Sequence, residues 1–340
     1  MVSYGGTTIK TISGIANGTT VKFTNELSTI YGLMSTVNSG TFTFTLTTKS
    51  GSSTIGTSTK TATGKITNAN PTFTADRVSY ADTNTAVTAV TGNALHIVQN
   101  KSTLAVTIKT AATGNKGASI SQYTLTVNGV TKTATKTGTI NFGAVNSTKD
   151  VTLTVVAKDS RGNTTTITKS ITVFAWSAPV VSATLERLNN YEDETYLTVN
   201  ATISSVNSKN TMTIKHKSKK SGGSYGTDTT INNKTKYTLT FSKDYEWVVS
   251  VTVADKFGST TKEFPLAKGK FPLFIDTDKN AVGINEFPSN GEALRVAGGD
   301  ATIEGLINHL RMGRLAFDTN TTQEIAITSR GVAIASSSIS

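Results

Sequence analysis

The sequence predicts an all-β protein built from successive β-sandwiches. Thr makes up about a fifth of the 340 residues, and a β-branched side chain with a hydroxyl group suits a solvated sheet face. Hydrophobic residues account for 36% of the chain and charged residues for only 16%, which differs from the high charge of disordered proteins. Long patterns of helical periodicity are nearly absent, so strands are the expected elements.

A repeated hairpin motif sets the size of the predicted unit. Residues 151–173 and 249–266 both contain alternating Val and Thr together with Asp-x-x-Gly-x-Thr-Thr. The Asp side chain is expected to close each turn, and the Gly to take a positive φ. The motifs begin at Asp159 and Asp255, which are 96 residues apart. A period near 100 residues with many short strands is typical of immunoglobulin-like or fibronectin-like sandwiches, and each hairpin would form the last two strands of one.

Prolines mark the expected domain boundaries. Pro71 and Pro179 end short linker-like segments, where a fixed φ and a missing backbone donor are favourable. The predicted order is a β domain, two tandem immunoglobulin-like sandwiches, and a strand linker with a C-terminal oligomerising β region. The first domain is either a partial immunoglobulin-like unit or a smaller β fold. The four ranges are 1–70, 71–175, 176–268 and 269–340.

Alternation of apolar residues predicts the individual strands. In the first domain it is clearest at 41–46, and residues 27–35 admit a helical turn. Asn128-Gly129 is a hairpin signal, and Trp247 is expected in a core. The strands expected in the two sandwiches are 104–109, 123–127, 139–142, 196–203, 211–217, 237–241 and 246–253.

Residues 271–305 predict short strands separated by turns. Apolar residues 273–275 precede a turn at 276–280, a return strand follows, and a second turn at 288–291 leads to a third strand. Strands this short cannot bury their own inner face and need a partner surface. Their order resembles a linker of trimeric phage tail fibres and appendages, with Asn285 in place of a usual Gly. The matching residues are Asn280, Val282, Gly283, Ile284, Pro288, Leu294, Val296 and Gly298.

The last forty residues extend this prediction. Residues 303–312 carry apolar side chains on one face of a short helix, and strands are expected at 323–329 and 332–335. A segment of about forty residues is too short to form a hydrophobic core of its own. The linker resemblance therefore implies a homotrimer in which three copies share one core.

The basic net charge of +11 does not predict nucleic-acid binding. Lysines are scattered among threonines, as in 131–137, which places them on outer strand faces where they also protect sheet edges. No basic motif is interleaved with aromatic residues as in nucleic-acid grooves. The sequence has no cysteine and no apolar stretch long enough for a membrane span, so neither disulfides nor a membrane partner is expected. No signal-peptide pattern is present at the N-terminus, and synthesis in a host cytoplasm is expected.

No residues predict catalysis or a cofactor. His96, His216 and His309 lack metal-ligand spacing and are expected to be solvated or incidental. Acidic residues 192–194 are expected in a solvated loop, with a cation between domains as the alternative. Paired carboxylates at glycosidase separation are not evident among the sparse acidic residues.

Asp276, Asp278 and Asn280 imitate the first ligands of a calcium loop. Ala281 and Phe287 stand where that loop needs Gly and Glu. The segment therefore predicts an ordinary turn, and no metal site is expected.

The whole layout resembles minor structural and tail-fibre-like proteins of siphophages that infect Gram-positive hosts such as streptococci. The two Asp-x-x-Gly-x-Thr-Thr hairpins and residues 271–299 carry the resemblance. It implies a non-enzymatic virion component in a tail fibre, baseplate or tail-tip appendage, with other tail proteins as partners. Host-surface attachment, with a cell-wall saccharide as ligand, is the expected role.

Lys215, Lys217, Lys219, Lys220 and Tyr225 are the predicted contact with the host surface. Four ammonium groups beside a flexible Gly-rich loop with an aromatic ring suit a phosphate-bearing cell-wall polymer. A solvated, charged loop is the alternative.

Two other classes of protein stay open. A bacterial surface adhesin of immunoglobulin-like repeats would carry a signal peptide and a wall anchor. A tail-associated cell-wall polysaccharide hydrolase would carry a pair of carboxylates in a groove. Turnover of purified wall glycan distinguishes the second class from a structural protein.

Overall fold

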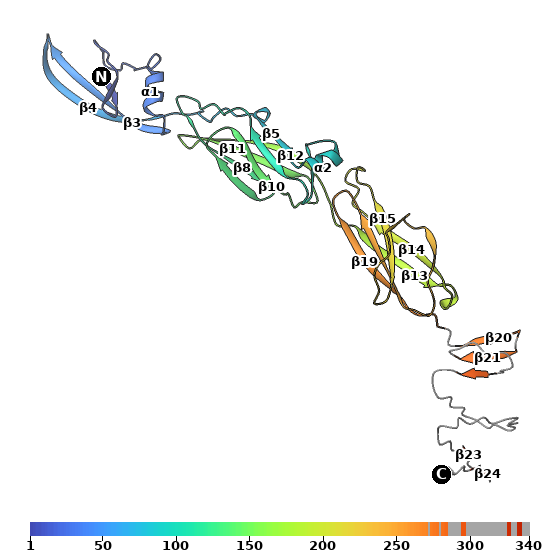
Figure 1. The fold of residues 1–340 in the computed structure, drawn as a ribbon. Helices are drawn as coiled ribbons and strands as arrows, with labels where there is room; N and C mark the ends of the chain where they lie inside the picture. Colours follow the sequence, from blue (N-terminus) through green and yellow to red (C-terminus); the bar gives the residue numbers. More distant parts are fainter. Residues whose placement is uncertain (271–272, 279, 285–293, 297–324, 328–331, 335–340) are drawn as a thin grey trace. The chain divides into compact units, whose positions relative to one another are not determined.

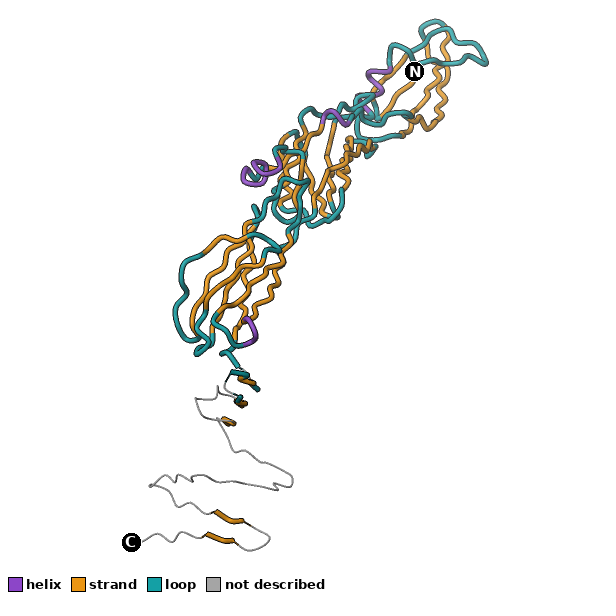
Figure 2. The backbone as a smooth tube through the Cα atoms, turned by 90° about the vertical axis from the view of Figure 1, so that its right-hand side faces the viewer, coloured by secondary structure: helices purple, strands orange, loops and turns teal. Residues whose placement is uncertain are grey.

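The protein is nearly all β (Figures 1 and 2). The computed structural model describes residues 1–270, 273–278, 280–284, 294–296, 325–327 and 332–334. The chain divides into two compact units, Met1–Gly269 and Lys270–Ser340. This confirms the predicted fold class of tandem β-sandwiches, which lie in the first unit.

The sandwich nearest the C-terminus has seven strands in two sheets. One sheet has the order β13-β14-β17, and the other has the order β16-β15-β18-β19. The fourth strand thus pairs with the third and not with the fifth, as in fibronectin type III domains. The strands are β13 (Val180–Arg187), β14 (Glu194–Thr202), β15 (Thr213–Lys220), β16 (Thr229–Ile231), β17 (Lys236–Thr240), β18 (Trp247–Ala254) and β19 (Ser259–Leu266).

The preceding sandwich has the same strand order with one insertion. Its sheets are β10-β7-β5 and β6-β12-β11-β8-β9. The insertion between its first two strands consists of α2 and β6, and β6 pairs parallel to the last strand, β12. The elements are β5 (Val78–Asp82), α2 (Thr85–Thr91), β6 (His96–Val98), β7 (Leu104–Ile108), β8 (Ile120–Val127), β9 (Val130–Ala134), β10 (Gly138–Gly143), β11 (Val151–Asp159) and β12 (Thr164–Phe174). A short 3-10 turn, η1 (Ala75–Arg77), precedes β5, and a second, η2 (Leu188–Asn190), follows β13.

Alternation along the strands builds the two cores. In β11, Leu153, Val155 and Ala157 are buried, while Thr154 and Val156 between them lie on the other face of the sheet and are half-buried. Burial of a side chain the size of Leu153 or Val155 contributes about 1.5–3 kcal/mol. Tyr123 is also buried in this core, and its hydroxyl accepts a hydrogen bond of 2.7 Å from the Ala112 N–H, so neither polar group is left unpaired.

Helix α2 was not predicted from the sequence. Its residues, TAVTAVT, include five that are β-branched and therefore disfavour helix. Its two caps define it: the Asn84 side chain accepts from the Ala86 N–H at 3.1 Å, and Gly92 ends the helix with a φ of 68°.

The first domain is one four-stranded sheet with a helix, not a two-sheet sandwich. The sheet order is β2-β1-β3-β4, and five residues form its buried core: Val2, Ile9, Ile30, Met34 and Phe42. The helical turn with which the sequence of 27–35 is compatible is helix α1. The elements are β1 (Val2–Tyr4), β2 (Thr7–Lys10), α1 (Leu27–Leu33), β3 (Ser39–Ser50) and β4 (Ser53–Lys65). Figure 1 shows β3 and β4 as a long hairpin.

The repeated Asp motif forms the turn between the last two strands of each sandwich. Asp159 Oδ1 accepts from the backbone N–H of Arg161 and of Asn163, at 2.9 and 2.8 Å. Asp255 Oδ1 accepts from the N–H of Phe257 and Gly258, at 2.7 and 2.8 Å. In this topology the last hairpin turn lies at the pole where the chain enters the sandwich. Each turn therefore contacts what precedes its own sandwich.

Arg161 joins the first domain to the second. Its side chain is buried, and Nε donates to the Met34 carbonyl at 2.7 Å, while Nη2 donates to the Tyr31 carbonyl at 3.3 Å. These carbonyls lie at the C-terminal end of α1, where the helix dipole favours a cation. Gly117 completes the contact, because a Cβ there would lie 2.8 Å from the Tyr31 carbonyl oxygen.

The second unit contains the short strands expected in 271–335. β20 (Phe274–Asp276) pairs antiparallel with β21 (Ala281–Ile284), and β22 (Leu294–Val296) pairs parallel with β21. β23 (Ile325–Ile327) and β24 (Val332–Ile334) form an antiparallel pair. The predicted turn at 288–291, the predicted helix at 303–312 and His309 lie outside the described residues.

Replacing Arg161 with Ala should loosen α1. The loss of hydrogen bonds from a buried cation should destabilise the first domain by about 2–3 kcal/mol, seen as faster hydrogen exchange of the α1 amides. Arg161→Lys should recover only part of the protection, because an ammonium group cannot reproduce the planar fork. Unchanged α1 exchange in Arg161→Ala would show that this contact does not hold the domains together.

Candidate functional site

The predicted host contact lies on the outer face of the β16-β15-β18-β19 sheet. Along β15, Ile214 and His216 are buried on the inner face, so Lys215, Lys217 and Lys219 project from the other face at alternate positions. Successive lysines on this face are separated by about 6.8 Å along the strand. We call Lys215, Lys217, Lys219 and Tyr225 the cationic face.

Tyr225 lies within reach of two of these lysines. The Nζ atoms of Lys219 and Lys217 are 4.5 and 5.2 Å from its ring centroid, within the range of cation–π attraction. Its hydroxyl donates to Glu263 Oε1. Partial burial and this hydrogen bond raise the pKa of the Tyr225 hydroxyl, so the ring carries no negative charge beside the lysines at neutral pH.

Strand register brings further polar groups to the cationic face. Lys217 pairs with Ser250, and Ser250 pairs with Glu263, so the three residues form one row across three strands. Lys215 lies in the next row with Thr252 and Thr261, whose hydroxyls are 2.8 Å apart. Sequence inspection missed Ser250 and Glu263, because only the register of β18 and β19 places them beside β15.

Lys220 is not part of the cationic face. It falls at the alternate position of β15, and its Nζ lies 3.7 Å from the Tyr245 ring centroid and 5.9 Å from that of Trp247. Of the five predicted contact residues, the structure thus groups four and separates Lys220. Trp247 packs against Phe241 with centroids 4.8 Å apart, and its partial burial against the sandwich core confirms it as a core residue.

The histidines are expected to be solvated or incidental, and the structure excludes solvation for His216. Its side chain is 8% exposed behind the cationic face, and Nδ1 has no hydrogen-bond partner. Burial lowers the pKa of this imidazole, because an apolar environment disfavours the charged form. The alternation along the strand could have predicted this burial, since position 216 falls on the inward-facing side.

The other sequence candidates are structural. Asp276 Oδ1 accepts from the Asp278 N–H at 3.1 Å, as the ordinary turn requires. Asp193 lies in a loop and accepts from the backbone of Lys243 at 2.7 Å. Among the described residues, no group of three or more His, Cys, Asp or Glu side chains is placed to hold a metal ion. Within the same residues, no helix is long and apolar enough to cross a membrane.

The strand order and the cationic face define a multi-sandwich protein with a surface suited to anionic ligands. The chain belongs to the family described as siphovirus proteins of unknown function (DUF859), whose model matches residues 1–324. No curated protein sequence matches it.

Several solved structures with repeated β domains are similar to this chain. The fibronectin(III)-like modules of CbhA from Clostridium thermocellum are 14% identical, over 51% of this chain and 88% of that one, with a TM-score of 0.23. Domains A168–A170 of titin are 11% identical, over 68% and 75%, with a TM-score of 0.29. A Ca²⁺-stabilised adhesin with which an Antarctic bacterium binds ice is 15% identical, over 72% and 61%, with a TM-score of 0.35.

The stability of the second sandwich, which contains His216, should fall as the pH falls below about 6.5. The ordinary His pKa is 6.5 and that of folded His216 is lower, so between the two values the unfolded chain binds a proton that the folded chain does not. The contribution of neutral His216 to the free energy of unfolding is complete above pH 6.5. It decreases as the pH falls toward the pKa of the folded state. Urea unfolding followed by Trp fluorescence measures it, and His216→Leu should remove this pH dependence. An equal pH dependence in that variant would assign it to other groups.

Proposed function

We propose that this siphovirus protein is a non-enzymatic structural component of the phage tail, in a fibre, baseplate or tail-tip appendage. We further propose that it contributes to host-surface attachment. The observation that supports attachment is the cationic face, where three lysines occupy alternate positions of β15 and two of them lie over a neutral aromatic ring. Its expected ligand is a phosphate-bearing cell-wall polymer.

The chemistry of the cationic face fits a repeating anion. Ammonium groups about 6.8 Å apart along one strand can each meet a successive phosphate of a linear polymer. The Tyr225 ring offers an apolar surface between them. Glu263 is engaged by the Tyr225 hydroxyl, so its carboxylate also orders the ring. A face of this kind binds by charge and repeat spacing, which suits many weak contacts on a cell surface.

The proposal includes a homotrimer formed through residues 270–340. Leu273 and Ile275 are 58% and 64% exposed in the single chain, although both belong to the apolar segment that precedes the return strand. Exposed apolar side chains next to strands of three or four residues indicate a surface that another copy covers. Three copies would also multiply the cationic face.

Removing the lysine charges should weaken binding to host walls. Lys215→Gln, Lys217→Gln and Lys219→Gln combined should lower affinity about tenfold or more, because up to about 1 kcal/mol is lost per surface ion pair. The measurement is sedimentation with purified Gram-positive cell walls, repeated on walls stripped of phosphodiester polymer, where the wild type should also bind weakly. Lys132→Gln, Lys136→Gln and Lys158→Gln combined, on the second domain, match the charge change and should bind normally.

Equal binding by the cationic-face variant would reject attachment through this face. Release of reducing sugar from the wall glycan by the wild type would instead support the hydrolase alternative.

Light scattering of the full chain should give three times the chain mass of 35.7 kDa. A version that ends at Gly269, the last residue of the first unit, should be a monomer. Monomers in both cases would contradict the trimer, and a trimer in both would move the oligomerising surface into residues 1–269.

A further inference from the structure

The outer part of the β3–β4 hairpin has no packing partner in the part of the chain that the structure describes. Residues 46–63, here called the ribbon, are all exposed. β1 pairs with β3 only at Phe42–Phe44, and β4 pairs with β3 alone. Both long edges of the ribbon therefore present free backbone groups. A two-stranded hairpin is marginally stable by itself in water, and such an edge is a template for another strand.

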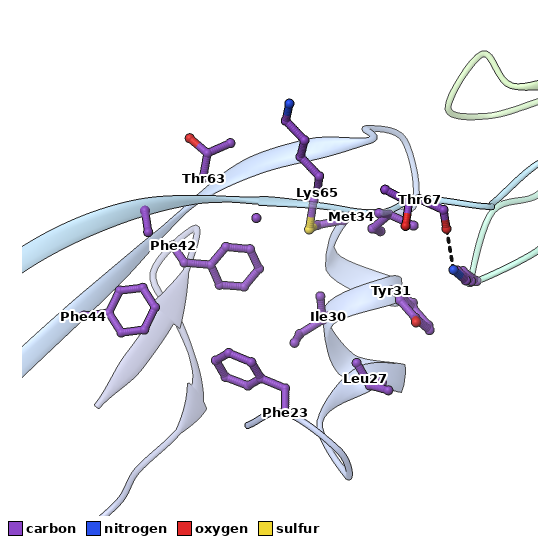
Figure 3. Close-up of a pocket in the computed structure, with 14 residues that line it drawn as sticks. Phe23, Leu27, Ile30, Tyr31, Met34, Phe42, Phe44, Thr63, Lys65 and Thr67 are labelled. Carbon is purple, nitrogen blue, oxygen red and sulfur yellow. Dashed lines mark hydrogen bonds between the residues drawn. The ribbon is translucent and has the colours of Figure 1, made fainter. Parts of the chain in front are cut away.

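The root of the ribbon borders an apolar hollow. A cavity of about 210 Å³ lies beside Val2, Ile12, Ile15, Phe44, Leu46 and Lys60. Ile15 is 44% exposed and Leu46 is 50% exposed. A second cavity, of about 330 Å³, also borders Phe44 and lies between the hairpin and α1 (Figure 3). Figure 3 shows Phe42, Phe44, Phe23 and Ile30 around this space.

Uncovered apolar groups concentrate in this domain. Of the thirteen large apolar side chains that are exposed in the described part of the chain, seven lie in the first 66 residues. The two sandwiches, which span more than twice as many residues, hold only four of them: Leu95, Val130, Val180 and Tyr245. Among the described parts of the chain, the first domain therefore has the largest share of exposed apolar side chains, which is typical of a surface that another molecule covers.

The positive charge of the first domain favours an acidic binding partner. Residues 1–70 contain five lysines and one acidic residue, Glu26. Glu26 is already paired with Lys10 at 2.8 Å, so the first domain of a second copy would bring further lysines and no free carboxylate to Lys49 and Lys60 on the ribbon. Lys60 lies on the face of Leu46 and Lys49 on the opposite face, so a strand from another protein with carboxylates on both of its faces would supply both lysines.

We propose that the ribbon is a docking site for an acidic β-strand of a different protein. The strand pairs with the free edge of β4 by strand addition, and a bulky apolar side chain of that strand enters the hollow beside Leu46. Carboxylates on its two faces meet Lys60, on the side of Leu46, and Lys49, on the opposite side. The site is separate from the cationic face, so one chain carries a protein-docking surface on its first domain and the proposed wall-binding surface on its third.

The test uses the full chain and a labelled peptide as long as β4, with Glu on both faces and one Val at the position that meets the hollow beside Leu46. Fluorescence anisotropy should show binding of this peptide, and none of a matched peptide with Lys in place of Glu. Lys49→Glu with Lys60→Glu should lower the affinity at least about tenfold, which corresponds to about 1.4 kcal/mol. Leu46→Ser should also weaken binding. Hydrogen exchange should show new protection confined to 46–63 when the peptide is bound.

Matched controls separate the ribbon from general charge and exposure effects. Lys132→Glu with Lys136→Glu makes the same charge change on the second domain, and Leu95→Ser removes an equally exposed side chain, at 49%. Both should bind the acidic peptide normally. Absence of binding, retained affinity in the Lys49→Glu and Lys60→Glu variant, or protection of 213–220 instead would overturn the proposal. Concentration-dependent protection of 46–63 without peptide would also overturn it, because a second copy would then be the occupant.

Discussion

The hydrogen-bonded Asp turn at the end of each sandwich is the interaction on which the arrangement of residues 1–269 depends. One carboxylate oxygen of Asp159 or Asp255 binds two backbone N–H groups of its own turn, which fixes the turn as a rigid projection. The residues inside the turn, Arg161 and Phe257, then contact the preceding part of the chain. Because the antiparallel topology places this turn at the entry pole, one local motif shapes both the hairpin and the domain junction.

The two junctions use opposite chemistry on the same scaffold. Arg161 meets backbone carbonyls of the first domain, so that junction is polar and directional. At the second junction, Phe257 and Trp176 pack around Val87, Val98 and Val206. The Trp176 Nε1–H also donates to Asp255 Oδ2 at 3.0 Å.

Asp255 remains charged at the second junction. Burial raises its pKa, but donated hydrogen bonds from Asn210, Phe257, Trp176 and Gly258 outweigh burial and hold the pKa below its usual value. Val206 is buried there with a φ of 44°, a conformation that is unfavourable for a β-branched residue. Tertiary packing therefore holds a strained residue where two sandwiches meet.

The sequence by itself determined the strands, the repeat and most of the cationic face, because these follow from local periodicity. Alternation along 213–220 placed Lys215, Lys217 and Lys219 on one side, and Asp-x-x-Gly placed the turns. Only the tertiary structure decided what lies beside those residues. Glu263 and Ser250 join Lys217 through strand register, His216 is buried by the opposite sheet, and α2 is held by its caps against its own propensity. The Thr-rich alternation of 41–63 predicts strands but does not tell whether another segment covers them. Their burial depends on residues that are distant in the chain.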